Sequence, residues 1–235
     1  MFSPFGGARQ TTHIICAMEK SKYRLSDGLV RQNIILMSAT AIGPVAAVAT
    51  NYHNAVALSV GFTVIAFISV LLCRFVPKKL VYTLRVIIYA LIGALAFIPA
   101  YMVVEHLYGK GMLETLGVYL PILIVNPLIL TKTETRFSLR PFHLMLYELA
   151  GYITGFNFVC VGVGIIRDLA VNGRIGTLEV NIAFRVPALS TVFGGLVFIG
   201  VSAGLFRHLY NKSKESKIKK AEKELRRQKL MEELT

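Results

Sequence analysis

The chain has 235 residues, of which 54% are hydrophobic and only 17% are charged, and its formal net charge is +13. Whole segments of about 20 residues lack charge, the length that a helix needs to cross the hydrocarbon core of a bilayer. This composition excludes an ordinary soluble domain and predicts an all-α polytopic membrane protein. The basic residues gather in connections and at the two ends, with no zinc-finger, RNA-recognition or helix-turn-helix pattern, so no nucleic-acid partner is expected.

Six apolar segments, separated by polar connections, are predicted to cross the membrane. They cover residues 30–50, 55–73, 80–104, 116–131, 144–166 and 186–206. They lie in a membrane domain over residues 29–207, between an N-terminal segment (1–28) and a basic C-terminal segment (208–235). The C-terminal segment is predicted to be a solvated helix, because its Glu and Lys residues recur at helical spacing. The connections are predicted at residues 51–53, 74–79, 105–114, 132–143 and 167–185.

The distribution of lysine and arginine predicts the orientation. Most of the 26 basic residues lie on the side that both ends share with residues 74–79 and 132–143. The positive-inside rule places that side in the cytoplasm. We therefore expect a multi-pass protein of a bacterial or archaeal cell (inner) membrane, surrounded by the lipid bilayer, with both termini cytoplasmic.

Two of the predicted spans are interrupted, the first at Gly43-Pro44 and the fourth at Asn126-Pro127. Proline removes a backbone donor and clashes with the preceding turn, so each helix is expected to break or kink there. A broken helix at membrane depth is tolerated only inside protein or around a cavity. Interrupted segments in both halves of a membrane protein point to a functional site near the midplane. The alternative is that both prolines only help packing.

Other polar and reactive groups are sparse. Asn157 is a neutral polar residue deep in the fifth span, whereas Arg85, Glu148 and Arg167–Asp168 fall near predicted span ends. Charges at membrane depth usually mark ion paths, so this chain alone is not expected to be a proton relay. The three cysteines are Cys16, Cys73 and Cys160. Their wide separation indicates neither a disulfide framework nor a metal site. The glycines of the fifth span, which would allow close helix packing, are Gly151, Gly155, Gly162 and Gly164.

The order of several motifs resembles the RnfE/NqrD subunit family, integral membrane components of Rnf and Na⁺-pumping NADH:quinone reductase complexes. The matching stretches are IGPVAAVATNYHNAVALSVGFT (42–63), RFVPKKL (74–80), LGVYLPILIVNPLILTKTETRF (116–137) and GVGIIRDLAVNG (162–173). The RFVPK turn and Glu134 are more similar to this branch than to its sister branch, RnfA/NqrE.

The resemblance implies six helices in two inverted repeats, at about residues 29–104 and 115–207, with helices 1 and 4 broken at mid-membrane. It also implies a sister RnfA/NqrE-like subunit of opposite orientation and other electron-transport subunits. At the interface the family holds an iron–sulfur cluster, using one cysteine from each broken helix. The loop motif with Arg167, Asp168, Asn172 and Gly173 is interpreted as a structural cap on the extracytoplasmic side.

The chain departs from the family at both cysteine positions, which are Gly43 and Pro127 here. Neither residue can ligate iron, because clusters need thiolates or, more rarely, imidazoles. We therefore expect no metal ligand and no cofactor bound by this chain, with a flavin, heme or iron–sulfur cluster in partner subunits. The site residues predicted for the interface or broken-helix site are Gly43, Pro44, Asn126, Pro127, Asn157 and Glu134.

Three functions remain open from the sequence. The first is a non-catalytic membrane subunit of a redox-driven electron transport complex, with or without ion coupling. The second is a small-molecule or ion transporter on the same inverted-repeat scaffold, in which half-helix ends would bind the substrate. The third is a structural membrane partner with no transport or redox role.

Overall fold

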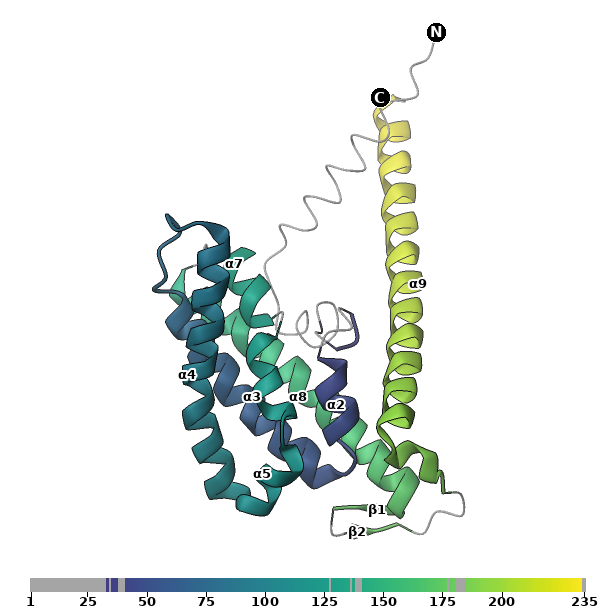
Figure 1. Ribbon diagram of the computed structural model, residues 1–235. Coiled ribbons are helices and arrows are strands. Elements are labelled where there is room, and N and C mark those ends of the chain that lie inside the picture. The colour runs from purple at the N-terminus through teal and green to yellow at the C-terminus, as the bar shows by residue number, and fades with distance from the viewer. Residues whose placement is uncertain are drawn as a thin grey trace.

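The computed structural model describes residues 33, 35–37, 41–126, 128–135, 137, 141–176, 178–180 and 185–233. The predicted N-terminal segment (1–28), with Cys16, lies outside these residues. So do most residues of the first predicted span before Ala41, and Pro127. Three long helices form the body of the molecule (Figure 1). They are α3 (Tyr52–Cys73), α4 (Tyr82–Tyr108) and α8 (Phe142–Asn172). Helix α3 lies between the other two and contacts both.

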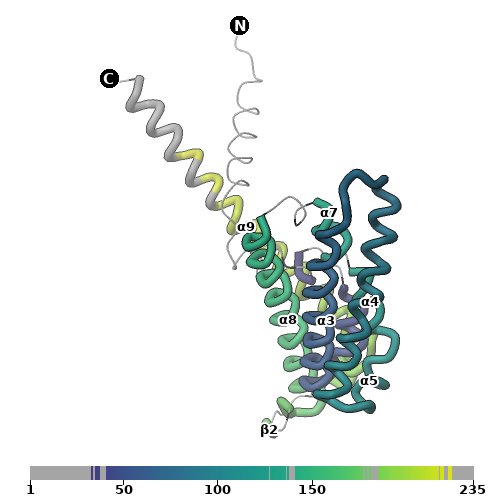
Figure 2. The backbone as a smooth tube through the Cα atoms, turned by 90° about the vertical axis from the view of Figure 1, so that its left-hand side faces the viewer, coloured from purple at the N-terminus to yellow at the C-terminus, as the bar shows by residue number. Residues whose placement is uncertain are grey.

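The fourth helix of spanning length takes a different direction. Helix α9 (Val192–Glu233) stands beside the body (Figure 1) and runs obliquely to α3, α4 and α8 in the view of Figure 2. Its contacts are with the short helix α2 (Ile42–Val48) and with the 3-10 turn Pro187–Ser190 that precedes it. Helix α2 therefore lies between α9 and the body.

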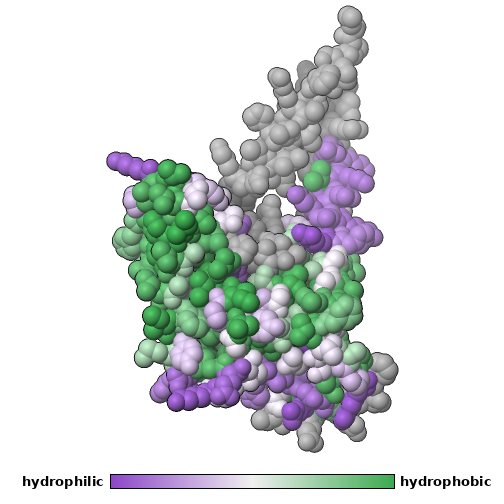
Figure 3. Space-filling model, in the orientation of Figure 1, coloured by the Kyte–Doolittle hydropathy of each residue, from purple (hydrophilic) through white to green (hydrophobic). Residues whose placement is uncertain are grey.

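Four helices are long and apolar enough to cross a membrane: α3, α4, α8 and the Val192–Ser216 part of α9. A fifth span is present if α5 (Lys110–Leu116) and Tyr119–Thr135, which meet at an angle of 61°, count as one bent element. Figure 3 shows an apolar belt between hydrophilic ends. The prediction of an all-α polytopic membrane protein is consistent with this arrangement, although the sixth span and the inverted repeat stay predictions.

The fourth predicted span is divided into short pieces. It begins with α6 (Tyr119–Ile122) and a 3-10 turn (Leu123–Val125), and continues beyond Asn126 as a π turn (Leu128–Lys132) and α7 (Thr133–Thr135). The bend before α6 lies at Gly117, whose φ of 44° and ψ of −130° suit glycine. The span is thus interrupted at Asn126, as predicted, and is also bent at its start.

Several predicted boundaries were wrong. Helix α3 begins at Tyr52 rather than residue 55, because the Asn51 side chain accepts a hydrogen bond from the Asn54 amide and caps the helix. The connection predicted at residues 105–114 is largely helical: α4 continues to Tyr108, and α5 follows after Gly109, which has a φ of 80°. Glu and Lys residues of this stretch are good helix formers, and the helix is interrupted at Gly109 but not at Gly111, which lies within α5.

The predicted loop at residues 167–185 was also partly wrong, because α8 continues to Asn172. After it comes a two-stranded antiparallel hairpin of β1 (Arg174–Ile175) and β2 (Leu178–Glu179). Helix α9 begins at Val192, six residues later than the predicted sixth span, because the 3-10 turn occupies the start. It then runs uninterrupted to Glu233, so the predicted C-terminal helix is a continuation of the sixth span.

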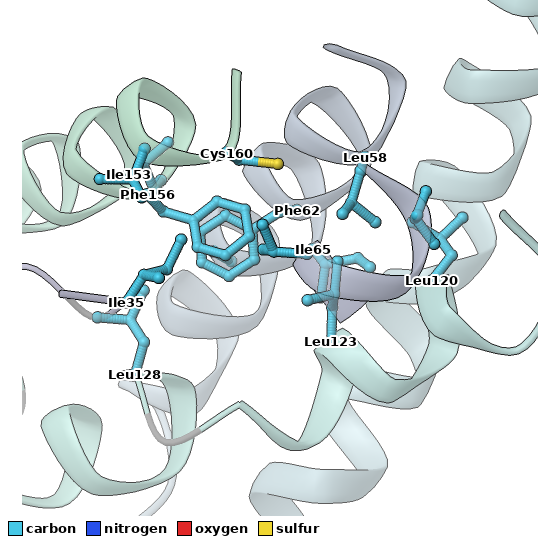
Figure 4. Close-up of a cluster of buried hydrophobic side chains, with 14 of the residues drawn as sticks. Ile35, Leu58, Phe62, Ile65, Leu120, Leu123, Leu128, Ile153, Phe156 and Cys160 are labelled. Carbon is cyan, nitrogen blue, oxygen red and sulfur yellow. The ribbon is translucent and has the colours of Figure 1, made fainter. Parts of the chain in front are cut away.

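The core lies where α3, α8 and the interrupted span meet (Figure 4). The rings of Phe62 on α3 and Phe156 on α8 pack with centroids 3.9 Å apart. Leu123 and Leu128, from the two sides of the interruption, are both buried in this cluster. One side of the interruption is therefore packed against the core of the chain.

Candidate functional site

The two interruptions predicted from the sequence meet at one cavity. It has a volume of about 250 Å³. Its described lining residues come from the start of α2 and from the segment that ends at Asn126. They are Ala41, Ile42, Gly43, Pro44, Ile122, Leu123, Val125 and Asn126. The fold thus brings together Gly43, Pro44 and Asn126, which are far apart in the sequence.

On the α2 side, the break precedes the Gly43-Pro44 pair instead of coinciding with it. Ala41 has a φ of 60°, and the helix begins at Ile42. Pro44 is thus in the first turn, where its missing N–H costs no intrahelical hydrogen bond. The interruption therefore lies at Ala41, two residues before Gly43, and Pro44 belongs to the first turn of the helix that follows it; residues 38–40 lie outside the described part of the chain. Gly43 is exposed, and a Cβ at this position would have nothing within 4 Å.

On the other side, Asn126 organises the interruption with its own polar atoms. Its Oδ1 accepts a hydrogen bond from the Leu128 amide at 2.9 Å, and its carbonyl accepts from the amides of Ile129 and Leu130. The residue is only 3% exposed. Its Nδ2 has no hydrogen-bond partner in the described part of the chain. Asn126 therefore caps the turn that follows the interruption.

The other two described site candidates lie elsewhere. Glu134 forms an ion pair with Arg85 at 2.5 Å and accepts a hydrogen bond from the Tyr89 hydroxyl at 3.0 Å. These contacts join α7 to α4. Asn157 on α8 donates to the Thr63 hydroxyl on α3 at 2.9 Å. Neither Glu134 nor Asn157 lines the cavity, so the predicted group of site residues is split between three places.

A second polar centre holds α2 in place. Arg167 is fully buried, and its guanidinium donates to the carbonyls of Ala46 (2.7 Å) and Ala49 (3.0 Å) in and just after α2. The same group donates to the carbonyls of Leu189 (2.9 Å) and Thr191 (3.2 Å), and more weakly to that of Ser190 (3.5 Å). One side chain thus donates to carbonyls at the end of α2 and in the turn before α9, of which that of Thr191 also accepts a hydrogen bond from the backbone amide of Gly195.

Asp168, the next residue, caps a different element. Its Oδ2 accepts hydrogen bonds from the amides of Tyr52, at the start of α3, and Gly176, and its Oδ1 accepts from Asn172. The interpretation of the Arg167 motif as a structural cap agrees with these contacts. Its placement in a loop was wrong, because burial and these hydrogen bonds keep both residues within α8. The spacing of Asp168 and Asn172, one helical turn apart, is the sequence signal for that helix.

The residues at the cavity do not fit an iron–sulfur cluster. The described lining offers aliphatic side chains, glycine, proline and one amide, and no thiolate or imidazole. Cys160 is buried between α8 and α3, where its Sγ lies 3.6 Å from the Ala55 carbonyl, and Cys73 is at the end of α3. Within the described ranges, no three His, Cys, Asp or Glu residues are grouped for a metal.

Comparison with known proteins confirms the family resemblance. A protein of Sodalis glossinidius, named as a subunit of an ion-translocating oxidoreductase complex, is 25% identical over 160 residues, which cover 67% of this chain and 68% of that protein. A protein of the same name from Yersinia pestis is 25% identical over 169 residues, 67% of each chain. Residues 22–204 match the family described as Rnf-Nqr subunit, membrane protein. Since this match covers most of the sequence, the chain belongs to the Rnf-Nqr subunit family of membrane proteins.

Proposed function

We propose that this chain is an integral membrane subunit of an ion-translocating electron transport complex of the Rnf/Nqr type. Its role is to supply one half of an interface with a sister membrane subunit, without ligating a cluster itself. Family membership supports the first part, as do relatives named as subunits of an ion-translocating oxidoreductase complex. The electron carrier then resides on partner subunits, as a flavin, a heme or an iron–sulfur cluster.

The observation that carries the interface is the meeting of the two interruptions at one open cavity. At its rim, Ile122 is 51% exposed and Val125 is 59% exposed. We call the surface formed by Ile42, Gly43, Ile122 and Val125 the break face. Irregular backbone at membrane depth is tolerated only against protein or a cavity, so a face of this kind favours a protein neighbour over lipid.

Site-specific photo-crosslinking in the native membrane tests the interface. A benzophenone amino acid replaces Val125 on the break face or, as a matched control, Leu95 on α4, which is 62% exposed. Gly93 on α4 faces Ile124. Leu95 comes two residues later, more than half a helical turn away, so it points away from the break face.

We expect Val125, but not Leu95, to crosslink to a membrane subunit of an oxidoreductase, identified by mass spectrometry. The same tagged preparation, purified in mild detergent, is expected to contain stoichiometric partner subunits and flavin, heme or iron–sulfur absorbance. A colourless protein without partners, with equal or absent crosslinking at both positions, would refute the proposal and favour a transporter.

A further inference from the structure

Helix α9 continues far beyond the length that a membrane requires. About 20 helical residues cross the hydrocarbon core, so a helix that begins at Val192 leaves the core near residue 211. The next turn lies among the lipid headgroups, and α9 still runs on to Glu233. We propose that residues 212–233, the basic arm, are a docking site for a protein domain with an acidic surface, outside the membrane on the side where α9 ends. This inference goes beyond the proposed function and does not depend on it.

The basic arm reaches out from the membrane as an uninterrupted helix. Residues 205–235 contain neither glycine nor proline, so the sequence has no helix breaker beyond the bilayer. In Figure 1, α9 extends past the ends of α3, α4 and α8. From residue 217 to residue 233 a helix rises about 25 Å, or about 20 Å along the membrane normal at a steep tilt of about 40°. The headgroup layer is only about 5–8 Å thick, so most of the arm lies beyond the lipid headgroups.

The charge of the basic arm selects an anionic partner. The arm contains nine Lys or Arg residues and five Glu residues. Lys212, Lys219 and Lys223 lie on one face of the helix, where together with Glu215 and Ser216 they line an open hollow of about 470 Å³. We call this surface the lysine face. All three lysines are exposed, and none forms an ion pair with another residue in the described ranges.

Among anionic partners, a protein fits the basic arm best. A second copy of the chain is disfavoured, because its arm carries the same positive charge and the whole chain has a formal net charge of +13. The glutamates interspersed along the arm disfavour a nucleic acid, whose phosphates would repel them. A protein surface can place carboxylates opposite the lysines and avoid the glutamates. The family match ends at residue 204, so family membership assigns the arm no role.

The spacing of the lysine face defines what the partner must present. From Lys212 to Lys223 the helix rises about 16 Å, so the carboxylates of the partner must be spread over a similar distance. Each exposed ion pair favours association by a factor of roughly two, and salt screens it. Three such pairs give reversible, salt-sensitive docking that also speeds encounter with the partner. The arm therefore suits a domain that associates and leaves, rather than a permanently bound one.

Photo-crosslinking of the full chain in intact cells tests the docking. A benzophenone amino acid replaces Ser216 within the lysine face or, as a matched control, Ile218. Two residues along a helix turn it by about 200°, so Ile218 lies on the opposite side at nearly the same height. Neither substitution removes a charge. We expect Ser216, but not Ile218, to crosslink to a protein, at a peptide that mass spectrometry places among Asp and Glu residues.

Charge reversal shows whether the lysine face causes the association. In the chain with the crosslinker at Ser216, Lys212→Glu, Lys219→Glu and Lys223→Glu are combined. Losing three ion pairs, each worth a factor of roughly two, should lower the yield of the protein adduct by about tenfold. Replacing the carboxylates of the crosslinked peptide by lysine in the partner should restore the adduct with this variant.

A control variant makes the same change in net charge away from the lysine face. It reverses three other exposed lysines, Lys78, Lys79 and Lys214, to glutamate. Lys214 lies five residues before Lys219, about 140° around the helix. We expect the adduct yield of this control to change by less than about twofold, because it keeps the three ion pairs of the lysine face. Both variants are compared at equal amounts of membrane-inserted chain.

Four results would overturn the proposal. They are adducts with lipid alone at Ser216, no adduct there, equal protein adducts at Ser216 and Ile218, and a protein adduct that survives reversal of the lysine face. The first would assign the arm to lipid headgroups and the second would make it a solvated spacer. If the reversed chain does not insert, the unaltered arm still decides: in isolated membranes with cytosol, raising KCl from about 50 mM to about 500 mM must lower the adduct yield at Ser216.

Discussion

Removing the buried guanidinium of Arg167 should detach α2 from its supports. In Arg167→Gln, the five backbone carbonyls that now accept hydrogen bonds from this group lose its charged donor. At about 0.6 kcal/mol for an average side-chain hydrogen bond in a membrane protein, five bonds give roughly 3 kcal/mol. We therefore expect the free energy of unfolding to fall by about 3 kcal/mol.

The assay is denaturant unfolding of the purified chain in mixed micelles, followed by circular dichroism. Arg167→Lys should be intermediate, because an ammonium keeps the charge but cannot reproduce the planar fork of donors. Arg174→Gln is the matched control: its Nε lies 3.9 Å from Asp168 and its side chain is 57% exposed. This control should change stability by less than about 0.5 kcal/mol. A loss below about 1 kcal/mol for Arg167→Gln would refute the reasoning, since that is within the range of a single hydrogen bond.

Two further substitutions probe the packing of the bundle. Gly164→Ala places a Cβ 2.4 Å from the Cβ of Ala55. It should lower the free energy of unfolding by about 1–3 kcal/mol, because α3 and α8 must move apart. Gly162→Ala is the control and should be tolerated, because its Cβ meets nothing within 4 Å. Equal melting temperatures for the two variants would contradict this. Arg85→Glu should destabilise the chain, because it places two carboxylates side by side. Adding Glu134→Arg should restore part of the lost stability. A double-mutant cycle of unfolding free energies measures the coupling between the two positions. A coupling energy near zero would show that the ion pair contributes nothing to holding α7 against α4.

Several parts of the candidate site could be predicted from local sequence. Asn126 was identified because an Asn-Pro pair inside an apolar segment is locally incompatible with a continuous helix, and the structure interrupts the helix there. Gly43 and Pro44 were identified by the same rule, although the rule does not distinguish a proline that ends a helix from one that begins it. That distinction depends on the conformation of Ala41, which no residue preference reveals.

Other contacts had no local signature. Glu134 was grouped with the breaks because it lies in a stretch that matches the family, and Asn157 because it lies deep in an apolar span. The structure pairs Glu134 with Arg85 and Asn157 with Thr63, on helices distant in the sequence. Arg167 was placed at the edge of a loop, because an arginine in an apolar helix is normally expensive. Its partners are backbone carbonyls, which every residue possesses, so the sequence contains no trace of them.

The sequence by itself determined the class of protein, the membrane environment and the interruption at Asn126, because hydrophobic length and proline chemistry act within a few neighbouring residues. Only the tertiary structure decided that the two interruptions face one cavity and that α2 is held by a buried guanidinium. These features depend on segments far apart in the chain, and their geometry is fixed by packing between helices.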